Sequence, residues 1–477
     1  MNFRMIKNIL GWILMFEAGF MLIPLITAAV YHEEAFLAYL ISIGICLFIG
    51  ALLIWRKPKN RTLYSREGFV IVSLSWIVLS LFGSLPFYIS KEIPSFVDAL
   101  FETVSGFTTT GSSILTNVEV LSKSNLIWRS FTNWIGGMGV LVFVMAFVPL
   151  SGGNNMHIMK AESPGPSVSK LVPRVKTTAL LLYLIYIVLT LLEFVFLLFG
   201  DMTVFEAICT SFSTAGTGGF GIKNDSFLSF SSYTQIVVTV FMLLFSINFA
   251  SYYLILLRRF KEAFTTEVRC FIGIVVSAIA VITLNTWGFF SSFGEALKHV
   301  SFTVASIIST SGFATVDFNA WPELSRAFIV LLMFVGACAG STGGGIKISR
   351  FIIFIKGAVK ELHLMIHPKQ VKKITIDKAP VEHEVVRSTN VYMICYLLIF
   401  VSSFVLICLG NHDLITSFTA VASSLNNIGP GLEAIGPTQN FAFFSSFEKI
   451  VLSFNMLAGR LELFPMLLLF SPITWKK

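Results

Sequence analysis

The sequence predicts an all-α polytopic membrane protein. Its plan is four repeats of a long helix, a pore helix and a second helix around a pseudo-fourfold pore, preceded by a two-helix amino-terminal unit. Three observations predict this: the composition, the long apolar runs and four similar glycine turns. Of the 477 residues, 55% are hydrophobic and 13% are charged, against roughly 25% charged in an average soluble domain.

The apolar runs match the length of about 20 residues that a membrane-spanning helix needs. The first run follows Arg4 and Lys7, but it exceeds the apolar core of a signal peptide and lacks a clear cleavage site, so we expect a retained helix. The first two runs form the amino-terminal unit, residues 1–60. The runs lie near residues 8–30, 34–55, 67–88, 125–149, 178–199, 232–257, 270–291, 326–340, 389–409 and 446–471.

Basic residues cluster in alternate loops between these runs. By the positive-inside bias such loops are cytoplasmic, which places the amino terminus of this multi-pass protein on the cytoplasmic side of the cell's inner membrane. The net charge of +8 is therefore a topology signal, and no nucleic-acid partner is expected, because such a partner needs a basic face on a folded module. The clusters are Arg56, Lys57, Lys59, Arg61 and Arg66; Lys160, Lys170, Arg174 and Lys176; Arg258, Arg259 and Lys261; and Lys369, Lys372, Lys373 and Lys378.

Four short apolar stretches each run into a polar turn that contains glycine: SGFTTTGS, STAGTGGF, SIISTSGF and SSLNNIGP. A threonine or an asparagine stands two positions before the glycine, and a serine stands six positions before it. Unrelated loops would not share residues at two fixed offsets, so we interpret them as copies of one unit repeated roughly every hundred residues. The repeats are assigned to residues 61–160, 161–262, 263–370 and 371–477, and the serines are Ser105, Ser213, Ser306 and Ser423.

The short segments before the turns, near 96–107, 203–214, 294–308 and 412–425, are predicted pore helices that enter the membrane and return. Non-helical backbone at that depth must be buried in protein or line a watery cavity. Backbone carbonyls there can replace the water shell of a cation, and glycine permits the backbone angles that turn them inward. The repeated serine is expected to pack or hydrogen-bond the pore helix. The predicted ion-binding residues of this selectivity filter are Thr109, Thr110, Gly111, Thr217, Gly218, Gly219, Thr310, Ser311, Gly312, Asn427, Ile428 and Gly429.

A single turn of this kind is common between membrane helices, and only four in register favour a filter. Two nucleotide-like motifs are accidental. GTGGFG (216–221) has no βαβ unit around it, and GSTGGGIK (340–347) has Ile346 between its last glycine and Lys347. The 6 cysteines show no metal-ligand spacing, so we expect no cofactor in this chain.

The stretch GACAGSTGGGIKISR (336–350) interrupts the helix that starts near 326. A helix broken inside the membrane usually faces a cavity, so the break is predicted to form a mobile gate beneath the third turn, in preference to a passive kink. Lys347 and Arg350 are placed at its cytoplasmic end. The predicted gate residues are Gly336, Gly340, Ser341, Thr342, Gly343, Gly344, Gly345 and Lys347.

Arg460 lies near the middle of the last apolar run and is also assigned to the gate. An arginine at this depth costs roughly 2.5–3.5 kcal/mol on insertion scales, so it should face the bundle interior. Glu462 is two positions on and is a poor helical partner. The alternative role is a structural pairing with a carbonyl or carboxylate elsewhere. Asn133 and GGMG (136–139) are assigned to close helix packing.

Acidic residues stand at the outer ends of the predicted pore segments. They either raise the local concentration of cations or serve as solvated and helix-cap charges, and both interpretations stay open. These residues are Asp98, Glu102, Asp201, Glu206 and Asp413.

The four turns, the NNIGP of the fourth repeat, the break at 336–345 and Arg460 together resemble the superfamily of Trk, Ktr and HKT potassium transporters. The resemblance covers nearly the whole chain. The extra helix pair at 8–55 makes the chain similar to the TrkH and TrkG branch, because KtrB lacks that pair.

The resemblance implies four M1–pore–M2 units, usually in a homodimer, and passive or coupled uptake of K+ as the transported ion. It makes Gly111, Gly219, Gly312 and Gly429 the filter glycines, 336–345 the intramembrane loop and Arg460 the gating arginine. It also implies a cytosolic nucleotide-binding ring of the TrkA type as partner. Sodium-preferring plant members carry serine at the position of Gly111, so potassium is favoured. Gly216 replaces a bulkier residue and is expected to loosen the second turn.

Three other functions are weighed against potassium uptake. A sodium or non-selective cation transporter of the same fold differs only in the filter. A secondary transporter of an organic solute requires inverted repeats and charges at the midplane, whereas these repeats run in one orientation. A membrane scaffold gives no reason for polar turns at fixed offsets. No enzymatic function is predicted.

Overall fold

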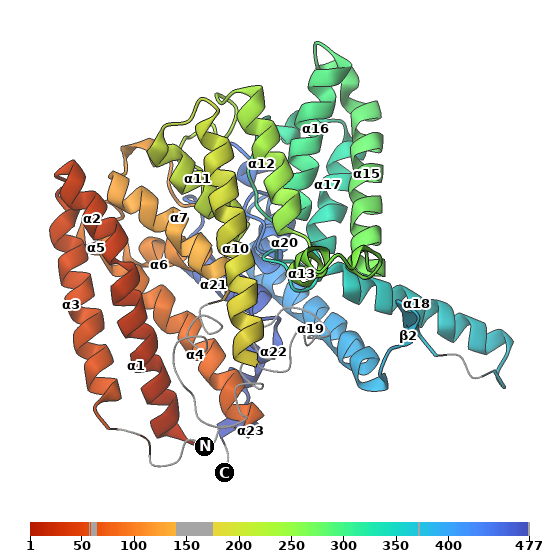
Figure 1. Ribbon diagram of the computed structural model, residues 1–477, viewed down its shortest axis with the longest axis horizontal. Coiled ribbons are helices and arrows are strands. Elements are labelled where there is room, and N and C mark those ends of the chain that lie inside the picture. The colour runs from red at the N-terminus through yellow and green to blue at the C-terminus, as the bar shows by residue number, and fades with distance from the viewer. Residues whose placement is uncertain (57, 59–63, 140–174, 371–372, 476–477) are drawn as a thin grey trace.

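The computed structural model describes residues 1–56, 58, 64–139, 175–370 and 373–475 (Figure 1). Within them the protein is helical apart from one antiparallel pair of short strands, β1 (Thr375–Ile376) and β2 (Ala379–Pro380). Two groups of predicted features lie outside the described residues. They are the end of the run 125–149, from residue 140 on, and the basic residues Lys57, Lys59, Arg61, Lys160, Lys170, Arg174 and Lys372, together with the side chain of Lys176.

The amino-terminal unit is a pair of antiparallel helices at one end of the molecule, coloured red in Figure 1. The first is built from α1 (Phe3–Phe20) and α2 (Leu22–Tyr31), and the second is α3 (Ala35–Ile54). Asn2 caps α1 by accepting the Met5 N–H at 3.2 Å. Gly11 and Gly50 let α1 and α3 approach closely, since a β-carbon on Gly50 would lie 3.0 Å from the Gly11 carbonyl oxygen.

Each repeat has the same order of elements: a long helix, a short pore helix, a glycine turn and a second helix. Repeat one has α4 (Ser65–Gly83), α5 (Leu85–Ile89), α6 (Phe96–Phe107), η1 (Val118–Val120) and α7 (Lys123–Gly137). Repeat two has α10 (Val175–Leu198), α11 (Val204–Gly216), α12 (Ser232–Phe245), α13 (Phe249–Leu256) and α14 (Phe260–Ala263). Repeat three has α15 (Thr266–Thr286), η2 (Trp287–Phe289), α16 (Phe293–Ile308), η3 (Phe318–Ala320), α17 (Glu323–Val335) and α18 (Ile348–Ile366). Repeat four has α19 (His383–Cys408), α20 (Leu414–Asn426), η4 (Glu433–Ile435), α21 (Ser446–Arg460), α22 (Phe464–Phe470) and α23 (Pro472–Trp475).

The pore helices are α6, α11, α16 and α20, and all four begin at a side-chain cap. Ser95, Thr203, Ser292 and Asp413 each accept a backbone N–H from the first turn of the helix that follows. Such a cap satisfies an N–H that has no partner within the helix, and this is the sequence signal that starts each pore helix. Their bounds agree closely with the four predicted segments.

The long first helices are the membrane spans of the repeats. Among the described residues, 6 helices are long and apolar enough to cross a membrane, or 7 if the bent pair α12 and α13 counts as one span. The second helices α7, α17 and α21 are too short to be counted. Figure 1 shows the long helices running side by side, whereas α18 runs sideways and projects from the body. The chain is thus a multi-pass membrane protein.

More of the second helices are broken than the sequence suggested, because the run at 232–257 and the run at 446–471 were each predicted as continuous. The axis bends by 92° between α12 and α13, where Asn248 caps α13 by accepting the Ala250 N–H at 2.8 Å. The last helix stops after Arg460, and Glu462 and Leu463 adopt φ of 59° and 65°. Pro465 then lies in the first turn of α22, which begins at Phe464, and proline is tolerated there. Only the break of repeat three was expected.

The prediction that Gly216 loosens the second turn is wrong. Gly216 is the last residue of α11 and is buried against α7. A β-carbon there would overlap the backbone carbonyl of Asn133. Gly136 of α7 is in a similar position against the carbonyl of Phe107. Glycine at these sites allows a pore helix and a second helix to pack at backbone distance, which agrees with the packing role assigned to Asn133 and GGMG.

Gly216→Ala is therefore expected to destabilise the protein. Overpacking of a tight contact typically costs about 1–3 kcal/mol, so the melting temperature in detergent should fall. Gly273→Ala in α15 is the matched control, because nothing lies within 4 Å of its added β-carbon and alanine favours a helix. Equal melting temperatures for the two variants would contradict the close packing of α11 on α7.

Candidate functional site

The four glycine turns (residues 109–111, 217–219, 310–312 and 427–429) meet in a closed ring. A β-carbon on Gly111 would overlap the carbonyl oxygen of Gly218, the residue before the next glycine of the ring. The same relation joins repeat two to repeat three and repeat three to repeat four. The ring closes at Gly429, whose β-carbon would lie 2.9 Å from the carbonyl oxygen of Thr110. The predicted residues, a hundred positions apart in the chain, are thus brought to one axis.

The fixed offsets have a backbone explanation. The residue two before each glycine ends the pore helix in the left-handed region, with φ of 55°, 54°, 62° and 55° at Thr109, Thr217, Thr310 and Asn427. The next N–H then bonds the carbonyl of the repeated serine at 2.8–3.0 Å: Thr110 to Ser105, Gly218 to Ser213, Ser311 to Ser306 and Ile428 to Ser423. This is a Schellman-type helix end. Each glycine itself has positive φ: 82°, 71°, 76° and 104° at Gly111, Gly219, Gly312 and Gly429.

The hydroxyls of the repeated serines, by contrast, have unequal partners. Ser306 donates to the Phe313 carbonyl at 2.6 Å, and Ser423 donates to the Gly429 carbonyl at 2.5 Å. Ser105 has no hydrogen-bond partner among the described residues. What the four repeats share at this position is the backbone carbonyl and a small buried side chain.

The side chains two before the glycines also differ between repeats. Thr217 donates to the Gly216 carbonyl at 2.6 Å, and Thr310 accepts the N–H of Gly344 at 2.7 Å. Asn427 donates to the Thr110 hydroxyl at 2.9 Å. These side chains hold the turns in place, and the ring is asymmetric in its polar contacts.

Eight backbone carbonyl groups of the turns have no hydrogen-bond donor among the described residues. Within the described residues, no hydrogen bond reaches the carbonyl oxygens of Thr110, Gly218, Ser311 and Ile428, or those of Thr109, Thr217, Thr310 and Asn427. All eight residues are buried. Buried carbonyls are nearly always paired with protein, water or a ligand. Eight carbonyl oxygens of the four turns are therefore without a hydrogen bond among the described residues, and the turns themselves carry no fixed negative charge.

Hydrogen bonds also join neighbouring repeats just outside the ring. Between repeats one and two, Asn224 accepts the Val118 N–H at 2.7 Å and donates its own N–H to Glu119 at 3.0 Å. Between repeats two and three, the Phe227 N–H bonds the Ala314 carbonyl at 2.9 Å. These bonds tie the loops that leave one turn to those of the next.

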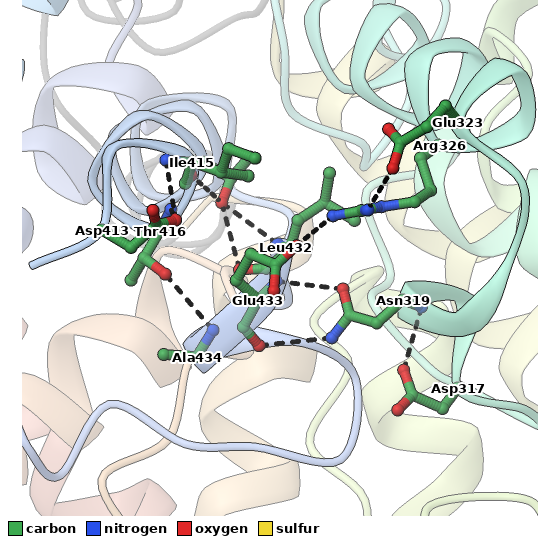
Figure 2. Close-up of polar contacts among 11 residues, drawn as sticks. Asp317, Asn319, Glu323, Arg326, Asp413, Ile415, Thr416, Leu432, Glu433 and Ala434 are labelled. Carbon is green, nitrogen blue, oxygen red and sulfur yellow. Dashed lines mark hydrogen bonds and ion pairs between the residues drawn. The ribbon is translucent and has the colours of Figure 1, made fainter.

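The other two junctions are tied by an ion pair and by hydrogen bonds. Between repeats three and four, the Asn319 side chain bonds the backbone of Glu433, and Arg326 pairs with the Glu433 carboxylate (Figure 2). Between repeats four and one, the Phe441 N–H bonds the Ser113 carbonyl at 2.8 Å. All four junctions around the ring are thus tethered.

The acidic residues of the outer segments serve mainly as caps and ion-pair partners. Glu102 is buried and pairs with Arg129 at 2.8 Å. Asp98 pairs with Lys449 at 2.6 Å, and Glu206 and Asp413 cap pore helices. Burial acts to raise the pKa of Asp201, but hydrogen bonds from Thr234 and Ser231 lower it below its ordinary value. The structural interpretation of these charges is favoured.

The intramembrane loop (residues 336–347) lies directly against the third and fourth turns. Gly344 donates its N–H to the Thr310 hydroxyl at 2.7 Å. A β-carbon on Gly344 would lie 2.5 Å from the Asn426 carbonyl oxygen and 3.0 Å from the Asn427 β-carbon. A β-carbon on Gly343 would lie 2.9 Å from the Ser309 carbonyl oxygen. The loop backbone therefore packs on the ends of two pore helices at the inner side of the ring.

Neighbouring helices hold the loop in place. The Phe249 N–H, at the bend between α12 and α13, bonds the Gly340 carbonyl at 3.0 Å. The Glu267 carboxylate accepts the N–H groups of Ala339 inside the loop at 2.8 Å and of Ser349 in the first turn of α18 at 3.1 Å. The bend in repeat two and the first turn of α15 in repeat three thus both support it.

The loop is closed at its neck by glycine. Gly336 and Gly345 have φ of 69° and 79°, and a β-carbon on Gly336 would lie 2.9 Å from the Gly345 α-carbon. Within the loop the Ser341 hydroxyl donates to the Cys338 carbonyl at 2.6 Å, and the Thr342 hydroxyl donates to the Phe245 carbonyl at 3.1 Å. The predicted gate residues therefore form one compact, hydrogen-bonded unit.

The cations next to the loop lie differently from the expectation. Lys347, expected at the cytoplasmic end of the break, is buried, and its ammonium group donates to the Gly343 carbonyl inside the loop. Arg350 pairs with Glu462 and lies 3.9 Å from the centre of the Tyr392 ring. Glu462, expected to be a poor partner for Arg460, is thus the partner of Arg350. It reaches Arg350 because the chain turns sharply after α21.

Arg460 bridges the loop and repeat one. Its guanidinium donates to the Thr342 carbonyl at 2.8 Å and to the Gly137 carbonyl at 2.7 Å. Both of these acceptors are backbone carbonyls. A cavity of about 70 Å³ lies beside it, lined among the described residues by Lys347, Arg460, Glu462 and glycines of the loop. The space beside the loop is therefore small, and apolar side chains such as Trp76 and Phe249 line it together with these charged groups.

Several contributing residues were missed by the sequence analysis. Glu267 carried no signal beyond its place in the first turn of a helix. Asn319 and Arg326 stand in an outer loop and at a helix start, where polar residues are ordinary. Asn248 is a helix-cap residue inside an apolar run, and that signal could have revealed the bend between α12 and α13.

Comparisons with known proteins agree with this architecture. The family model described as TrkH, cation transport protein, matches residues 36–477. The chain is 35% identical to the Trk system potassium uptake protein TrkH of Escherichia coli (strain K12) and 33% identical to TrkG of the same strain, covering 100% of both chains in the first case and 99% in the second. It is similar to the crystal structure of the potassium transporter TrkH from Vibrio parahaemolyticus, with TM-score 0.89, 33% identity and full coverage of both chains.

Thr310→Val is expected to loosen the intramembrane loop. The change keeps the side-chain shape but leaves the buried Gly344 N–H without its acceptor, a loss of about 1–3 kcal/mol. Amide hydrogen exchange of the segment 336–347 should then be about tenfold faster or more. Thr310→Ser keeps the hydroxyl and is the control. Unchanged exchange in the valine variant would show that the bond does not hold the loop.

Proposed function

The chain belongs to the TrkH family of cation transport proteins, and from that premise we propose that it is the membrane subunit of a Trk-type potassium uptake system. The family, the fold and a non-enzymatic role agree with the predictions from sequence. We further propose that the four glycine turns are the selectivity filter and that the loop 336–347 with Arg460 is the gate.

The ring of unpaired carbonyls is the observation that carries the proposal. Eight buried backbone oxygens from four repeats have no hydrogen bond among the described residues. Carbonyl dipoles can replace the hydration shell of K+, while the absence of a fixed charge lets the ion leave again. Each glycine is needed twice, for its positive φ and for its close approach to the next repeat. A filter built of backbone alone suits a monovalent cation.

Uptake through such a pore needs no pumping chemistry. Moving one positive charge through an inside-negative potential releases about 2.3 kcal/mol per 100 mV, which corresponds to about fiftyfold accumulation. A selective pore with a gate is therefore sufficient. Coupling to protons or sodium is not required by this driving force.

The gate follows from the position of the loop. The loop packs against the inner ends of pore helices α16 and α20, and Arg460 holds it by its Thr342 carbonyl. A cation that leaves the filter would meet the loop backbone and then the Arg460 guanidinium. Opening requires the loop to leave Thr310 and Asn427. Gly336 and Gly345, where the two ends of the loop meet, provide the conformational freedom for that movement.

The orientation and the partners are inferred from the family and from charge. Two connections carry described basic residues, the one between α13 and α15 and the one between α18 and α19, and the positive-inside bias assigns both to the cytoplasm. These residues are Arg258, Arg259, Lys261, Lys369, Lys373 and Lys378. A cytoplasmic amino terminus agrees with this placement. We infer a cytosolic nucleotide-binding ring of the TrkA type on that face, and a homodimer in the bilayer.

Potassium-dependent growth of a strain that lacks other uptake systems, together with cation flux in liposomes, tests the function. We expect rescue at low K+ and flux of K+ well above that of Na+. Gly111→Ser should lower this ratio, because the serine side chain meets the Gly218 carbonyl. Equal flux of both ions in the unmodified protein would favour the sodium or non-selective alternative. An unchanged ratio in the serine variant would remove Gly111 from the filter.

Arg460→Ala should raise K+ flux in liposomes that lack any cytosolic partner. The change removes the hydrogen bonds that hold Thr342 and the positive charge below the filter. Arg460→Lys is the control, because it keeps the charge while it loses the forked geometry. If flux in the alanine variant equals that of the unmodified protein, Arg460 has only a structural role.

A further inference from the structure

The fourth glycine turn is packed into repeat three. Ile428 and Leu432, which flank Gly429, belong to the apolar core cluster built by repeat three, together with Ile308 and Trp321. Pro430 lies against the third turn, since its δ-carbon is 2.8 Å from the position of a β-carbon on Gly312. Repeat three therefore provides much of the wall against which the fourth turn rests.

The loop that follows the fourth turn has an unfavourable backbone conformation at Glu433. Glu433 has φ of 55°, a region that residues with a side chain rarely adopt. The Asn319 side chain accepts the Glu433 N–H at 3.0 Å and donates to the Glu433 carbonyl at 3.2 Å. The Asn319 side chain thus bonds both the backbone N–H and the backbone carbonyl of Glu433. Strained backbone persists only where its surroundings hold it.

Arg326 completes this tether through the Glu433 side chain, as Figure 2 shows. The Arg326 side chain is 12% exposed and lies between two carboxylates, Glu433 of repeat four and Glu323 of its own helix at 2.8 Å. Glu433 is 44% exposed and Glu323 is 86% exposed. The guanidinium is therefore fixed by its surroundings, while its partners are accessible to substitution.

We propose that Asn319 and Arg326 are positioning residues that set the ion discrimination of the fourth glycine turn from the neighbouring repeat. The proposal rests on the filter function proposed above. The path is short: Glu433 is joined through Leu432 and Gly431 to Pro430, whose ring fixes its φ. Leu432 is anchored on the way, because its N–H bonds the Thr419 hydroxyl at 3.1 Å. Release of Glu433 shifts Pro430 against Gly312 and displaces the carbonyl oxygens of Asn427 and Ile428.

Flux ratios of K+ to Na+ in liposomes test this for Arg326→Gln, Glu433→Gln and the double variant. An accessible ion pair contributes a factor of about two to five, and we expect each single variant to lower the ratio by that amount. The double variant should fall no further, because both changes break one contact. Asn319→Ala should lower the ratio as well. Glu262→Gln is the matched control and should leave the ratio unchanged, because it breaks an exposed ion pair with Arg259 within repeat two.

Melting temperatures of the same variants in detergent separate positioning from general stability. A ratio unchanged in both Glu433→Gln and Arg326→Gln, or a loss of flux that follows the melting temperature without a change in ratio, would overturn the proposal. Additive effects in the double variant would do so too. The Glu433 side chain is partly exposed, so we expect the Glu433→Gln variant to fold and the test to remain informative. Unselective flux in the unmodified protein would instead contradict the proposed function.

Discussion

The close approach of each glycine turn to the next is the constraint on which the structure depends. At Gly111, Gly219 and Gly312 a single added carbon would overlap the carbonyl oxygen of the neighbouring repeat. This approach brings unpaired carbonyls of four repeats together, and it requires pore helices that end at the same depth. The capped starts of α6, α11, α16 and α20 and their left-handed ends set that depth.

Two shells of contacts keep the ring closed. Outside, loops of adjacent repeats are tied at all four junctions, through neutral bonds such as Phe227 to Ala314 and through ion pairs such as Arg326 to Glu433. Inside, the loop 336–347 rests on Thr310 and Asn427 and is held by Glu267 and Arg460. The inner shell uses mostly backbone groups of glycines, which can rearrange. The outer shell uses side chains with fixed partners. This arrangement is compatible with the filter and the gate that we propose.

The repeats share a backbone plan but not a set of side-chain contacts. Ser306 and Ser423 bond carbonyls, whereas Ser105 has no partner among the described residues. Repeat three contributes the loop 336–347, the apolar side chains packed around Ile428 and the outer hydrogen bonds to Glu433. One repeat therefore contacts the fourth turn from both sides of the ring. The polar contacts of the four turns are therefore asymmetric, and Gly216 is not the cause, because that glycine is tightly packed.

The sequence by itself determined the elements and the family. Composition and apolar runs predicted the spans, and the serine and glycine offsets predicted the repeats and the pore helices before the turns. These signals are local, since each depends on residues within a few turns of one another. Only the tertiary structure decided that Glu462 pairs with Arg350 and that Lys347 is buried in the loop. The hydrogen bonds from the Asn319 side chain to the Glu433 backbone were likewise visible only in the structure. Those contacts join residues more than a hundred positions apart or turn on a change in chain direction. Polar residues of these types are equally common where they bind nothing, so no pattern in the chain distinguishes them.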